Sequence, residues 1–343
     1  MESLFKDEKD LPAMTWLQKF CCRILKAGAI PRHIAIIMDG NRRYARKHKY
    51  DNRLGHLKGF DKLAETLSWC SELGINEVTI YAFSIENFKR SKDEVDNIMD
   101  LAREKFHRLQ AKKEQIRKHG VCIRIIGDIN LLPPDLQKLA ADIVYFSRNN
   151  TRAILNVCLA YTSRNEITNA VKDVASGVES GLLYPSDSSE ELLEKCLYTN
   201  HSKDPDLLIR TSGETRLSDF LLWQSSYTVL SFTEVLWPEF TIWHLFGAVL
   251  HYQRSYISVK SAKEFNASER RKAVLESDKQ CVIQQLKTDG TNCTLEDKAL
   301  ENSIEEKLTQ FTMDREERIK TFLKFVENKR ELHIRNILET DRT

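Results

Sequence analysis

A short apolar run that ends in a carboxylate constrains this chain most. Residues 34–38 are all apolar and include three isoleucines, which is typical of a strand buried on both faces. The run stops at Asp39, and Gly40, Asn41 and two adjacent arginines follow. Gly permits a tight turn, and Asn is able to cap a helix that begins there. A strand, a turn and a helix N-terminus in this order form an anion site, and the arginines favour a phosphate or diphosphate.

The same stretch has a second interpretation, which is a strand that ends in an Asp-Gly turn beside solvated arginines. In the anion-site interpretation, Asp39 would repel the anion unless a cation lay between them. Mg²⁺ is the candidate, because it is commonly held by one carboxylate together with ligand phosphates. This stretch alone leaves both interpretations open.

Strand and helix patterns alternate along most of the chain. The expected strands are residues 34–38, 78–83, 121–126, 153–160, 206–210 and 229–232. The expected helices are residues 55–74, 91–119, 135–148, 163–178, 189–196 and one that begins near Thr241. This alternation predicts an α/β fold, with a mostly parallel central sheet of about six strands and helices on both faces.

Ligands bind such sheets at the carboxyl ends of the strands. Polar segments follow five of the expected strands, at residues 39–40, 84–90, 127–128, 161–164 and 210–218. Five arginines lie in or beside these segments, and they are Arg42, Arg43, Arg90, Arg210 and Arg216. One loop arginine is usually solvated, but five at one sheet edge could hold two diphosphates, with Asp39 and Mg²⁺ between them.

The composition excludes several classes of protein. With 52 Lys and Arg against 50 Asp and Glu, the net charge of +2 does not favour nucleic-acid binding through charge alone. The eight cysteines form no CxxC pair and no zinc-like cluster with His, which fits a reducing compartment. The sequence contains no Walker A, dinucleotide-binding or hydrolase-elbow motif. It also lacks a run of 18 apolar residues, so no transmembrane helix is expected, and the charged residues 2–10 are not a signal peptide.

Both ends of the chain lie outside the expected sheet. Residues 12–26 predict an amphipathic helix carrying Trp16 and Phe20, which either touches a membrane surface or a long apolar ligand, or covers the domain. From Ser255 onward the composition is highly charged, and residues 289–292 separate two helical segments. This pattern predicts a C-terminal helical hairpin that packs on itself or on a partner. A mostly solvated tail is the alternative.

Four segments carry a resemblance to a known family. They are HIAIIMDGNRRYA from His33, GHLKGF from Gly55, YAFSIENFKRS from Tyr81, and DLLIRTSGETRLSDFLLWQ from Asp206 followed by LWPEF. Together they resemble the cis-prenyltransferases, the undecaprenyl diphosphate synthase family, over about the first 250 residues. Within the family the match is close to the animal enzymes that make dehydrodolichyl diphosphate. The chain would then comprise an N-terminal amphipathic helix in residues 1–28, a catalytic domain with an apolar tunnel in residues 29–254, to which the resemblance applies, and a charged helical tail in residues 255–343.

The resemblance also implies a site for two diphosphates. Asp39 would organise Mg²⁺. The residues that would hold the allylic diphosphate are Asp39, Gly40, Asn41, Arg42, Arg43 and Arg90. Those that would hold isopentenyl diphosphate are Arg210, Arg216 and Ser218. Ser84 and Asn87 match residues near the condensing carbons, and His56 matches a residue close to the departing diphosphate.

The implied activity is a Mg²⁺-dependent condensation of successive isopentenyl diphosphates onto farnesyl diphosphate. Its product would be a polyprenyl (dehydrodolichyl) diphosphate, the precursor of dolichol for protein glycosylation. The alternative is a non-catalytic prenyl-diphosphate-binding or scaffold subunit, which the presence of Asp39 and the arginines disfavours.

Two positions depart from the family pattern. Bacterial homodimeric members carry a Glu about eleven residues after the Ser that matches Ser218, where this chain has Val229. They also end in Arg-x-Gly, whereas no such motif follows Trp237 here, and Arg254 is the nearest candidate. The resemblance therefore implies a second subunit of the Nogo-B receptor type, which supplies Arg-x-Gly in trans. That subunit would hold the complex at the cytoplasmic face of the endoplasmic reticulum, as a peripheral membrane protein.

Overall fold

The computed structural model describes residues 13–288 and 298–339 of the chain. The chain divides into two compact units. Unit 1 comprises Met1–Ile167, Tyr198–Val259 and Leu332–Thr343, and unit 2 comprises Thr168–Leu197 and Lys260–Glu331. The charged residues 2–10 and the predicted helix break at residues 289–292 lie outside the described residues.

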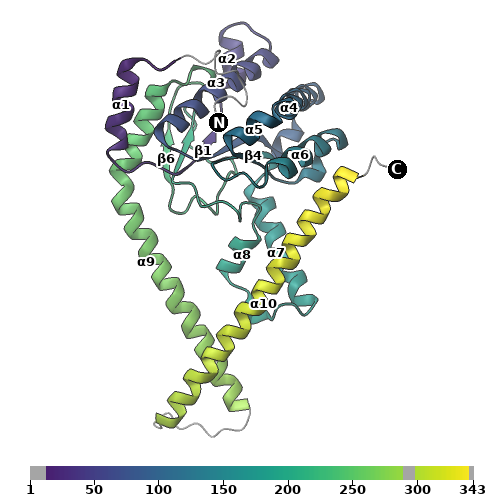
Figure 1. The fold of residues 1–343 in the computed structure, drawn as a ribbon, viewed down its shortest axis with the longest axis vertical. Coiled ribbons are helices and arrows are strands. Elements are labelled where there is room, and N and C mark those ends of the chain that lie inside the picture. The colour runs from purple at the N-terminus through teal and green to yellow at the C-terminus, as the bar shows by residue number, and fades with distance from the viewer. Residues whose placement is uncertain (1–12, 289–297, 340–343) are drawn as a thin grey trace. The chain divides into compact units, whose positions relative to one another are not determined.

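Unit 1 contains one six-stranded parallel sheet (Figure 1). Its strands are β1 (His33–Ile37), β2 (Glu77–Ser84), β3 (Val121–Ile126), β4 (Ala153–Tyr161), β5 (Leu207–Arg210) and β6 (Val229–Phe232). Their order is β3-β4-β2-β1-β5-β6, and every neighbouring pair is parallel. Each predicted strand is present to within one residue at either end, so the predicted fold class is confirmed.

Helices precede, connect and follow the strands. They are α1 (Trp16–Lys26), α2 (Asn41–Lys47), α3 (Asn52–Leu73), η3 (Ile85–Lys89), α4 (Lys92–Ala111), α5 (Lys113–His119), η4 (Ile129–Leu131), α6 (Pro134–Ser147), α7 (Ser163–Glu179), η5 (Pro185–Asp187), α8 (Glu190–Cys196), η6 (Trp237–Glu239), α9 (Ile242–Thr288) and α10 (Lys298–Glu339).

Two helices differ from the predicted ones. The single helix predicted for residues 91–119 is two helices, because Lys112 leaves the helical conformation with φ −101° and ψ 17°. No Gly or Pro marks this break in the sequence, and nothing in the structure explains why it falls at Lys112. Helix α9 runs without interruption across residue 254, where the catalytic domain was predicted to end. That boundary and the apolar tunnel stay predictions.

The alternation of side chains along the strands divides the core of unit 1 into two clusters. In β1, Ile34 and Ile36 face the larger cluster, which also contains side chains of α3, α6 and α9. Ala35 and Ile37 face the smaller cluster, which is built around Tyr161 and Phe220. Because side chains alternate with a period of two, Arg210 at the end of β5 lies on the same face as Leu208 of the smaller cluster.

Helix α1 buries one side and exposes another. Thr15 and Gln18 form a capping box at its start, and Cys22 and Leu25 are buried. The side chains of Trp16, Leu17, Phe20 and Ile24 are exposed, and Trp16 retains 79% of its accessible surface. The helix therefore covers the domain, as one interpretation of the sequence predicted. Contact of its exposed apolar row with a membrane or an apolar ligand stays a prediction.

In unit 2, the C-terminal helix α10 packs against other segments of the chain. Phe322 is buried, and an added Cβ at Gly177 of α7 would lie 2.5 Å from its ring. Arg318 donates to Asp187 at 2.8 and 3.0 Å. Arg330 donates to Asp173 of α7 at 3.1 Å, and Arg315 pairs with Asp278 of α9. These contacts pack one side of α10 against other segments of unit 2, and residues 168–197 supply a packing surface that the sequence did not predict. Most of the described side chains from residue 255 onward are nevertheless exposed, so the alternative of a mostly solvated tail is not contradicted.

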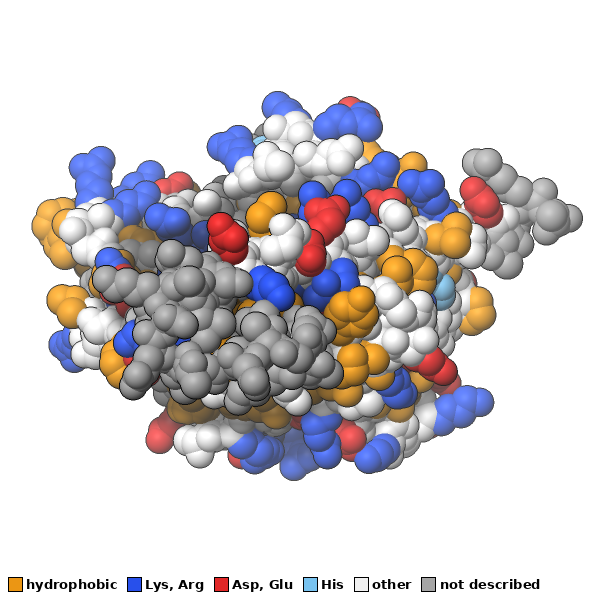
Figure 2. Space-filling model, turned by 90° about the horizontal axis from the view of Figure 1, so that it is seen from below, with side chains coloured by type: hydrophobic (Ala, Val, Ile, Leu, Met, Phe, Trp, Pro, Cys, Tyr) orange, Lys and Arg blue, Asp and Glu red, His pale blue; other side chains and the backbone are white. Residues whose placement is uncertain are grey.

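Basic and acidic side chains are interspersed over the face of the molecule shown in Figure 2. This mixture agrees with the near balance of charge in the sequence. Among the described residues, no helix combines the length and the apolar character needed to cross a membrane.

Gly55 permits the close approach of α2 to α3, which generates a stability prediction. A Cβ added at Gly55 would lie 2.5 Å from the backbone oxygen of Asn41 and 2.9 Å from the Cβ of Ala45. Gly55→Ala should lower the free energy of unfolding by about 1–3 kcal/mol, because the α2 backbone has to move. The matched control is Gly247→Ala in α9, where an added Cβ meets no atom within 4 Å. It should raise stability by up to about 1 kcal/mol, because Ala favours helix. Urea unfolding compares the two variants, and a stabilised Gly55→Ala protein would contradict the prediction.

Candidate active site

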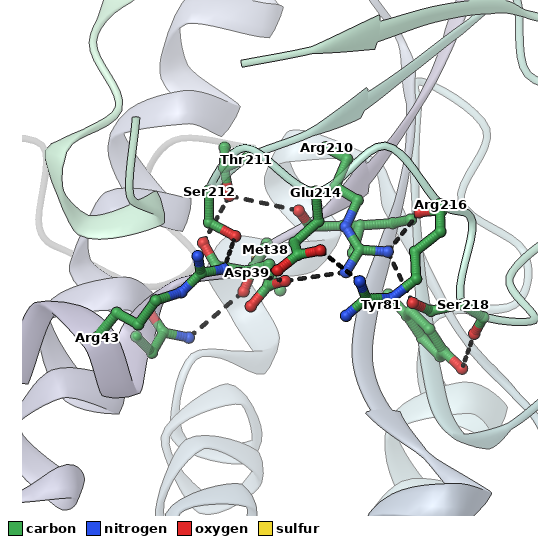
Figure 3. Close-up of polar contacts among 12 residues, drawn as sticks. Met38, Asp39, Arg43, Tyr81, Arg210, Thr211, Ser212, Glu214, Arg216 and Ser218 are labelled. Atoms are coloured by element: carbon green, nitrogen blue, oxygen red, sulfur yellow. Dashed lines mark hydrogen bonds and ion pairs between the residues drawn. The ribbon is translucent and has the colours of Figure 1, made fainter. Parts of the chain in front are cut away.

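Asp39 is fixed directly after β1 by both its backbone and its side chain. Its backbone oxygen accepts hydrogen bonds from the Thr211 hydroxyl at 2.7 Å and from the Trp237 amide at 3.0 Å. Its carboxylate accepts a hydrogen bond from Arg210 at 2.9 Å and lies 3.6 Å from the guanidinium of Arg43 (Figure 3). A single carboxylate therefore lies between two arginines that come from different parts of the chain.

The arginines keep Asp39 ionised. Burial raises the pKa of the Asp39 carboxyl, but the hydrogen bond and charge of Arg210 act in the opposite direction. The Ser212 hydroxyl and Arg43 add to this effect, and the pKa lies below its usual value. Asp39 is consequently an anion at neutral pH.

Gly40 and Asn41 begin α2, but not in the way the sequence predicted. Gly40 is the N-cap residue, with φ +110°, and an added Cβ would lie 3.0 Å from Leu236. The turn therefore requires Gly. Asn41 is the first helical residue rather than the cap. Its side-chain nitrogen makes only a long hydrogen bond, to Met38 O at 3.5 Å. Its buried Oδ1 has no hydrogen-bond partner and lies against Gly59.

Arg42 and Arg90 converge on one carboxylate. Arg90 donates to Glu94 of α4 at 2.7 Å, and Arg42 lies 3.4 Å from the same carboxylate. Arg43 of α2 instead donates to the Ser212 hydroxyl and lies 3.7 Å from Glu214. These three arginines therefore approach the same region from α2 and from the end of η3.

Arg210 organises the opposite side of Asp39. Its side chain is only 3% exposed, and it donates to the backbone oxygen of Arg216 and, at 2.7 Å, to the Ser218 hydroxyl. Arg216 is 65% exposed and pairs with Glu214. The buried arginine thus ties its own loop together and leaves the second arginine accessible.

Ser84 and Asn87 form a capping box at the start of η3. The Ser84 hydroxyl accepts from the amide of Glu86 at 3.2 Å, and the Asn87 side-chain oxygen accepts from the Ser84 amide at 3.1 Å. The two predicted residues therefore fix each other after β2.

His56 of α3 is an uncharged group beside these arginines. Burial lowers the pKa of its imidazole, the charges of Arg90 and Arg42 lower it further, and Glu94 opposes them. The ring is therefore neutral at pH 7. Its Nε2 is buried and has no hydrogen-bond partner.

All twelve predicted site residues line one cavity of about 890 Å³. They are Asp39, Gly40, Asn41, Arg42, Arg43, His56, Ser84, Asn87, Arg90, Arg210, Arg216 and Ser218. Gly127 and Asp128 were expected at the same sheet edge but do not line the cavity, because they follow the outermost strand β3. The cavity therefore opens over the ends of β1, β2, β4 and β5 but not over the end of β3.

Comparisons with known proteins identify the family. A family model described as a putative undecaprenyl diphosphate synthase matches residues 37–258. The chain belongs to this family. The sequence-based prediction of a cis-prenyltransferase is thereby confirmed.

Similar proteins carry related names. The human dehydrodolichyl diphosphate synthase complex subunit is 56% identical over 313 residues, which cover 91% of this chain and 93% of the human one. A tritrans,polycis-undecaprenyl-diphosphate synthase (geranylgeranyl-diphosphate specific) from Pyrococcus horikoshii is 48% identical, over 67% of this chain and 86% of that protein. A solved structure of lavandulyl diphosphate synthase from Lavandula x intermedia, in complex with dimethylallyl diphosphate, matches with a TM-score of 0.60 at 37% identity. That match covers 65% of this chain and 95% of the lavandulyl enzyme.

The cavity of this cis-prenyltransferase contains residues that the sequence did not single out. Tyr81, Arg164, Glu214 and Asp219 also line it. Glu214 and Asp219 lie within the segment from Asp206 that carried the resemblance, and Arg164 closes the polar segment after β4. For Arg164, Glu214 and Asp219, the position after a strand was the available signal, because the carboxyl ends of parallel strands meet at one edge. Tyr81 lies inside β2.

Val229 lies away from the cavity. It is buried at the start of β6, beside Leu207, whereas the cavity lies at the Arg210 end of β5. Three residues along a strand span about 10 Å. A carboxylate at this position would therefore not complete the cavity of its own chain.

The donor set of the cavity fits a cation that shares its ligands with a substrate. Among the described residues, no group of three or more His, Cys, Asp or Glu is placed to hold a metal ion. Asp39 is ionised and lines the cavity. Glu214 is a second carboxylate that lines the cavity, and it lies 3.7 Å from Arg43. Mg²⁺ is commonly bound by one or two carboxylates together with phosphate oxygens and waters. The residues present therefore suit Mg²⁺ that arrives with a diphosphate.

Replacing Asp39 by Asn removes the charge that balances the buried Arg210. The free energy of unfolding at pH 7 should fall by about 1–3 kcal/mol. A loss at the lower end of this range is expected, because the Asp39 side chain is 34% exposed and solvent screens its charge. Because the pKa of Asp39 is lowered in the folded state, this stabilisation is complete above the unfolded-state pKa of about 3.9. It is lost as the pH falls through the folded-state value.

Urea unfolding of wild type and Asp39→Asn at pH 7 and at about pH 3 measures this effect. The difference between the two proteins should shrink at the acidic pH. Asp128→Asn, which changes a carboxylate outside the cavity, is the matched control. A difference that is the same at both pH values would contradict the ionised pairing of Asp39 with Arg210.

Proposed function

We propose that this chain is the catalytic subunit of a long-chain cis-prenyltransferase. It condenses isopentenyl diphosphate successively onto farnesyl diphosphate and makes dehydrodolichyl diphosphate, the precursor of dolichol for protein glycosylation. The observation that carries the proposal is one cavity in which two groups of arginines flank Asp39. The product is supported by the 56% identity to the human dehydrodolichyl diphosphate synthase complex subunit.

Each arginine group suits one diphosphate. Arg42, Arg43 and Arg90, with the turn at Gly40 and Asn41, would hold the allylic diphosphate. Arg210, Arg216 and Ser218 would hold the diphosphate of isopentenyl diphosphate. A hydrogen bond to a charged group contributes about 1.5–3 kcal/mol, so two or three per diphosphate give substantial binding without any apolar contact.

Carboxylates prepare these arginines for their ligands. Glu94 lies between Arg42 and Arg90, and Glu214 contacts Arg43 and Arg216. Diphosphate oxygens would compete with these carboxylates for the same donors. The arginines are therefore held near their binding positions before substrate arrives, which lowers the reorganisation needed in the reaction.

Mg²⁺ bound at Asp39 would neutralise charge on the departing diphosphate. The neutral His56, with its unpartnered Nε2 beside Arg90, could donate a hydrogen bond to the same diphosphate. Ser84 and Asn87, which fix each other at the end of β2, would lie near the condensing carbons.

A second subunit would complete the active enzyme. The human and mouse relatives are both named as subunits of a dehydrodolichyl diphosphate synthase complex. Arg254, the nearest sequence candidate for Arg-x-Gly, lies inside α9 and does not line the cavity. The partner, of the Nogo-B receptor type, would supply Arg-x-Gly in trans and hold the complex at the cytoplasmic face of the endoplasmic reticulum. The exposed Trp16 and Phe20 of α1 suit a peripheral contact with that membrane.

Incorporation of labelled isopentenyl diphosphate tests the catalytic role. The full chain with its partner subunit, farnesyl diphosphate and Mg²⁺ should give a labelled polyprenyl product. Asp39→Ala should lower the rate by at least about a hundredfold, because charge on the departing diphosphate is then poorly stabilised. Asp128→Ala, which removes a carboxylate from the same sheet edge but outside the cavity, should retain the wild-type rate. Binding of farnesyl diphosphate without any incorporation would favour the scaffold function, and an active Asp39→Ala protein would refute the metal role.

The same assay with and without the partner tests whether this chain needs a second subunit for activity. The purified chain alone should incorporate little label, and addition of the partner should restore the rate. A partner variant in which the Arg of Arg-x-Gly is replaced by Ala should fail to restore it. Full activity of the isolated chain would refute the proposed need for a second subunit.

A further inference from the structure

The loop after β5 has an unusual backbone where it carries Ser218. Ser218, Asp219 and Leu221 have positive φ angles of 51°, 59° and 47°. The left-handed region is unfavourable for non-glycine residues, so the surrounding structure has to hold the loop in place. Ser218 is one of the residues proposed to bind isopentenyl diphosphate. The supports of this loop therefore determine the geometry of that half of the site.

The first turn of α7 holds the loop from one side. The Ser163 amide donates to the backbone oxygen of Asp219 at 2.8 Å, and the Leu222 amide donates to the Ser163 hydroxyl at 2.8 Å. The Asp219 carboxylate accepts from the Arg164 amide at 3.1 Å and from the Arg164 Nε at 2.8 Å. Asp219 therefore caps the N-terminus of a helix that begins 56 residues earlier in the chain, and binds its second residue twice.

Buried groups fix the same turn of α7 from behind. Glu166 is fully buried, and its carboxylate accepts from the Tyr161 hydroxyl at 2.6 Å and from the Thr199 amide at 3.0 Å. The side-chain nitrogen of Gln224 donates to it at 2.9 Å. A buried carboxylate with this many donors is held firmly, so the first turn of α7 is a rigid support.

Residues of the sheet hold the loop from the other side. Arg210 donates to the Ser218 hydroxyl at 2.7 Å, and the Tyr81 hydroxyl donates to the Ser218 backbone oxygen at 3.3 Å. Phe220 stacks on the Tyr81 ring with 4.5 Å between the ring centroids. Ser218 is thus fixed between β5 and α7, and Asp219 is the residue through which α7 acts on it.

We propose that Asp219 and Arg164 are a positioning pair for the isopentenyl diphosphate half of the site. By capping α7, Asp219 maintains the left-handed backbone that directs Ser218 and Arg216 into the cavity. The inference rests on the proposed function, because it assigns the pair to one of the two substrates. Neither residue was assigned a role by the sequence.

Asp219 and Arg164 contribute unequally to the stability of the loop after β5. The Arg164 side chain is 75% exposed, so solvent weakens its ion pair with Asp219. The Asp219 side chain is only 12% exposed and also accepts from a backbone amide at the helix terminus. Loss of Asp219 should therefore have a larger effect than loss of Arg164.

Steady-state kinetics of the full chain with its partner subunit test the pair. Asp219→Ala should raise the KM for isopentenyl diphosphate by about tenfold, which corresponds to about 1.4 kcal/mol. The KM for farnesyl diphosphate should not change. Asp219→Asn should restore most of the wild-type KM, because Asn tolerates the left-handed conformation and retains an acceptor for the Arg164 amide. Arg164→Ala should raise the same KM by less than Asp219→Ala.

Asp135→Ala is the matched control, because Asp135 also pairs with an arginine, Arg103, in the first turn of a helix of unit 1. It should leave both KM values unchanged. An equal rise of both KM values in Asp219→Ala, together with a lower Tm, would show a general structural role and overturn the proposal. A higher Mg²⁺ requirement would place Asp219 at the metal and would also overturn it. Inactivity of the wild-type complex would instead refute the proposed function.

Discussion

The buried guanidinium of Arg210 is the interaction on which the site depends. It lies at the end of β5, where it pairs in register with Ile37 of β1, so Asp39 lies just beyond it on the neighbouring strand. A buried cation costs several kcal/mol unless charge and hydrogen bonds compensate it. Asp39 supplies the charge, and the Arg216 backbone and Ser218 hydroxyl accept further hydrogen bonds, whereas the buried Nε has no partner. One planar side chain therefore joins two strand ends and a loop, which the single ammonium of Lys could not do in the same way.

Carboxylates among the arginines explain how so many cations lie side by side. Seven arginines and four carboxylates line the cavity, counted among the described residues. Without the carboxylates, repulsion among the arginines would spread the loops apart. With them, the cations are held in place and remain able to exchange a carboxylate for a diphosphate. The acid at the centre, which was unexplained when residues 34–43 were considered alone, is thus a structural requirement of Arg210 as well as a candidate metal ligand.

The sequence predicted the parts of the site that depend on strand ends and missed those that depend on backbone conformation. The six strands follow from the alternation of strand and helix patterns in the sequence. The convergence of Asp39 with the arginines follows because the carboxyl ends of parallel strands meet at one edge. The family resemblance identified the same residues. The cap of α7 by Asp219 could not be predicted, because it joins distant segments through a left-handed backbone that Ser218 and Asp219 do not favour intrinsically. Likewise, Asn41 is a good N-cap residue by type, but the glycine before it takes that position.

The strand order explains why the site lies where it does. From β1 the chain passes to β2, then to β3 at the edge and back to β4 between them, all on one side of β1, whereas β5 and β6 lie on the other side. The connections diverge at the boundary between β1 and β5, and such a switch point leaves a crevice at the carboxyl ends of the strands. Asp39 and Arg210 lie at that boundary, and their ion pair spans it. Asp128, at the end of the outermost strand β3, is far from the switch point, which is why a polar segment at the same edge takes no part in the cavity.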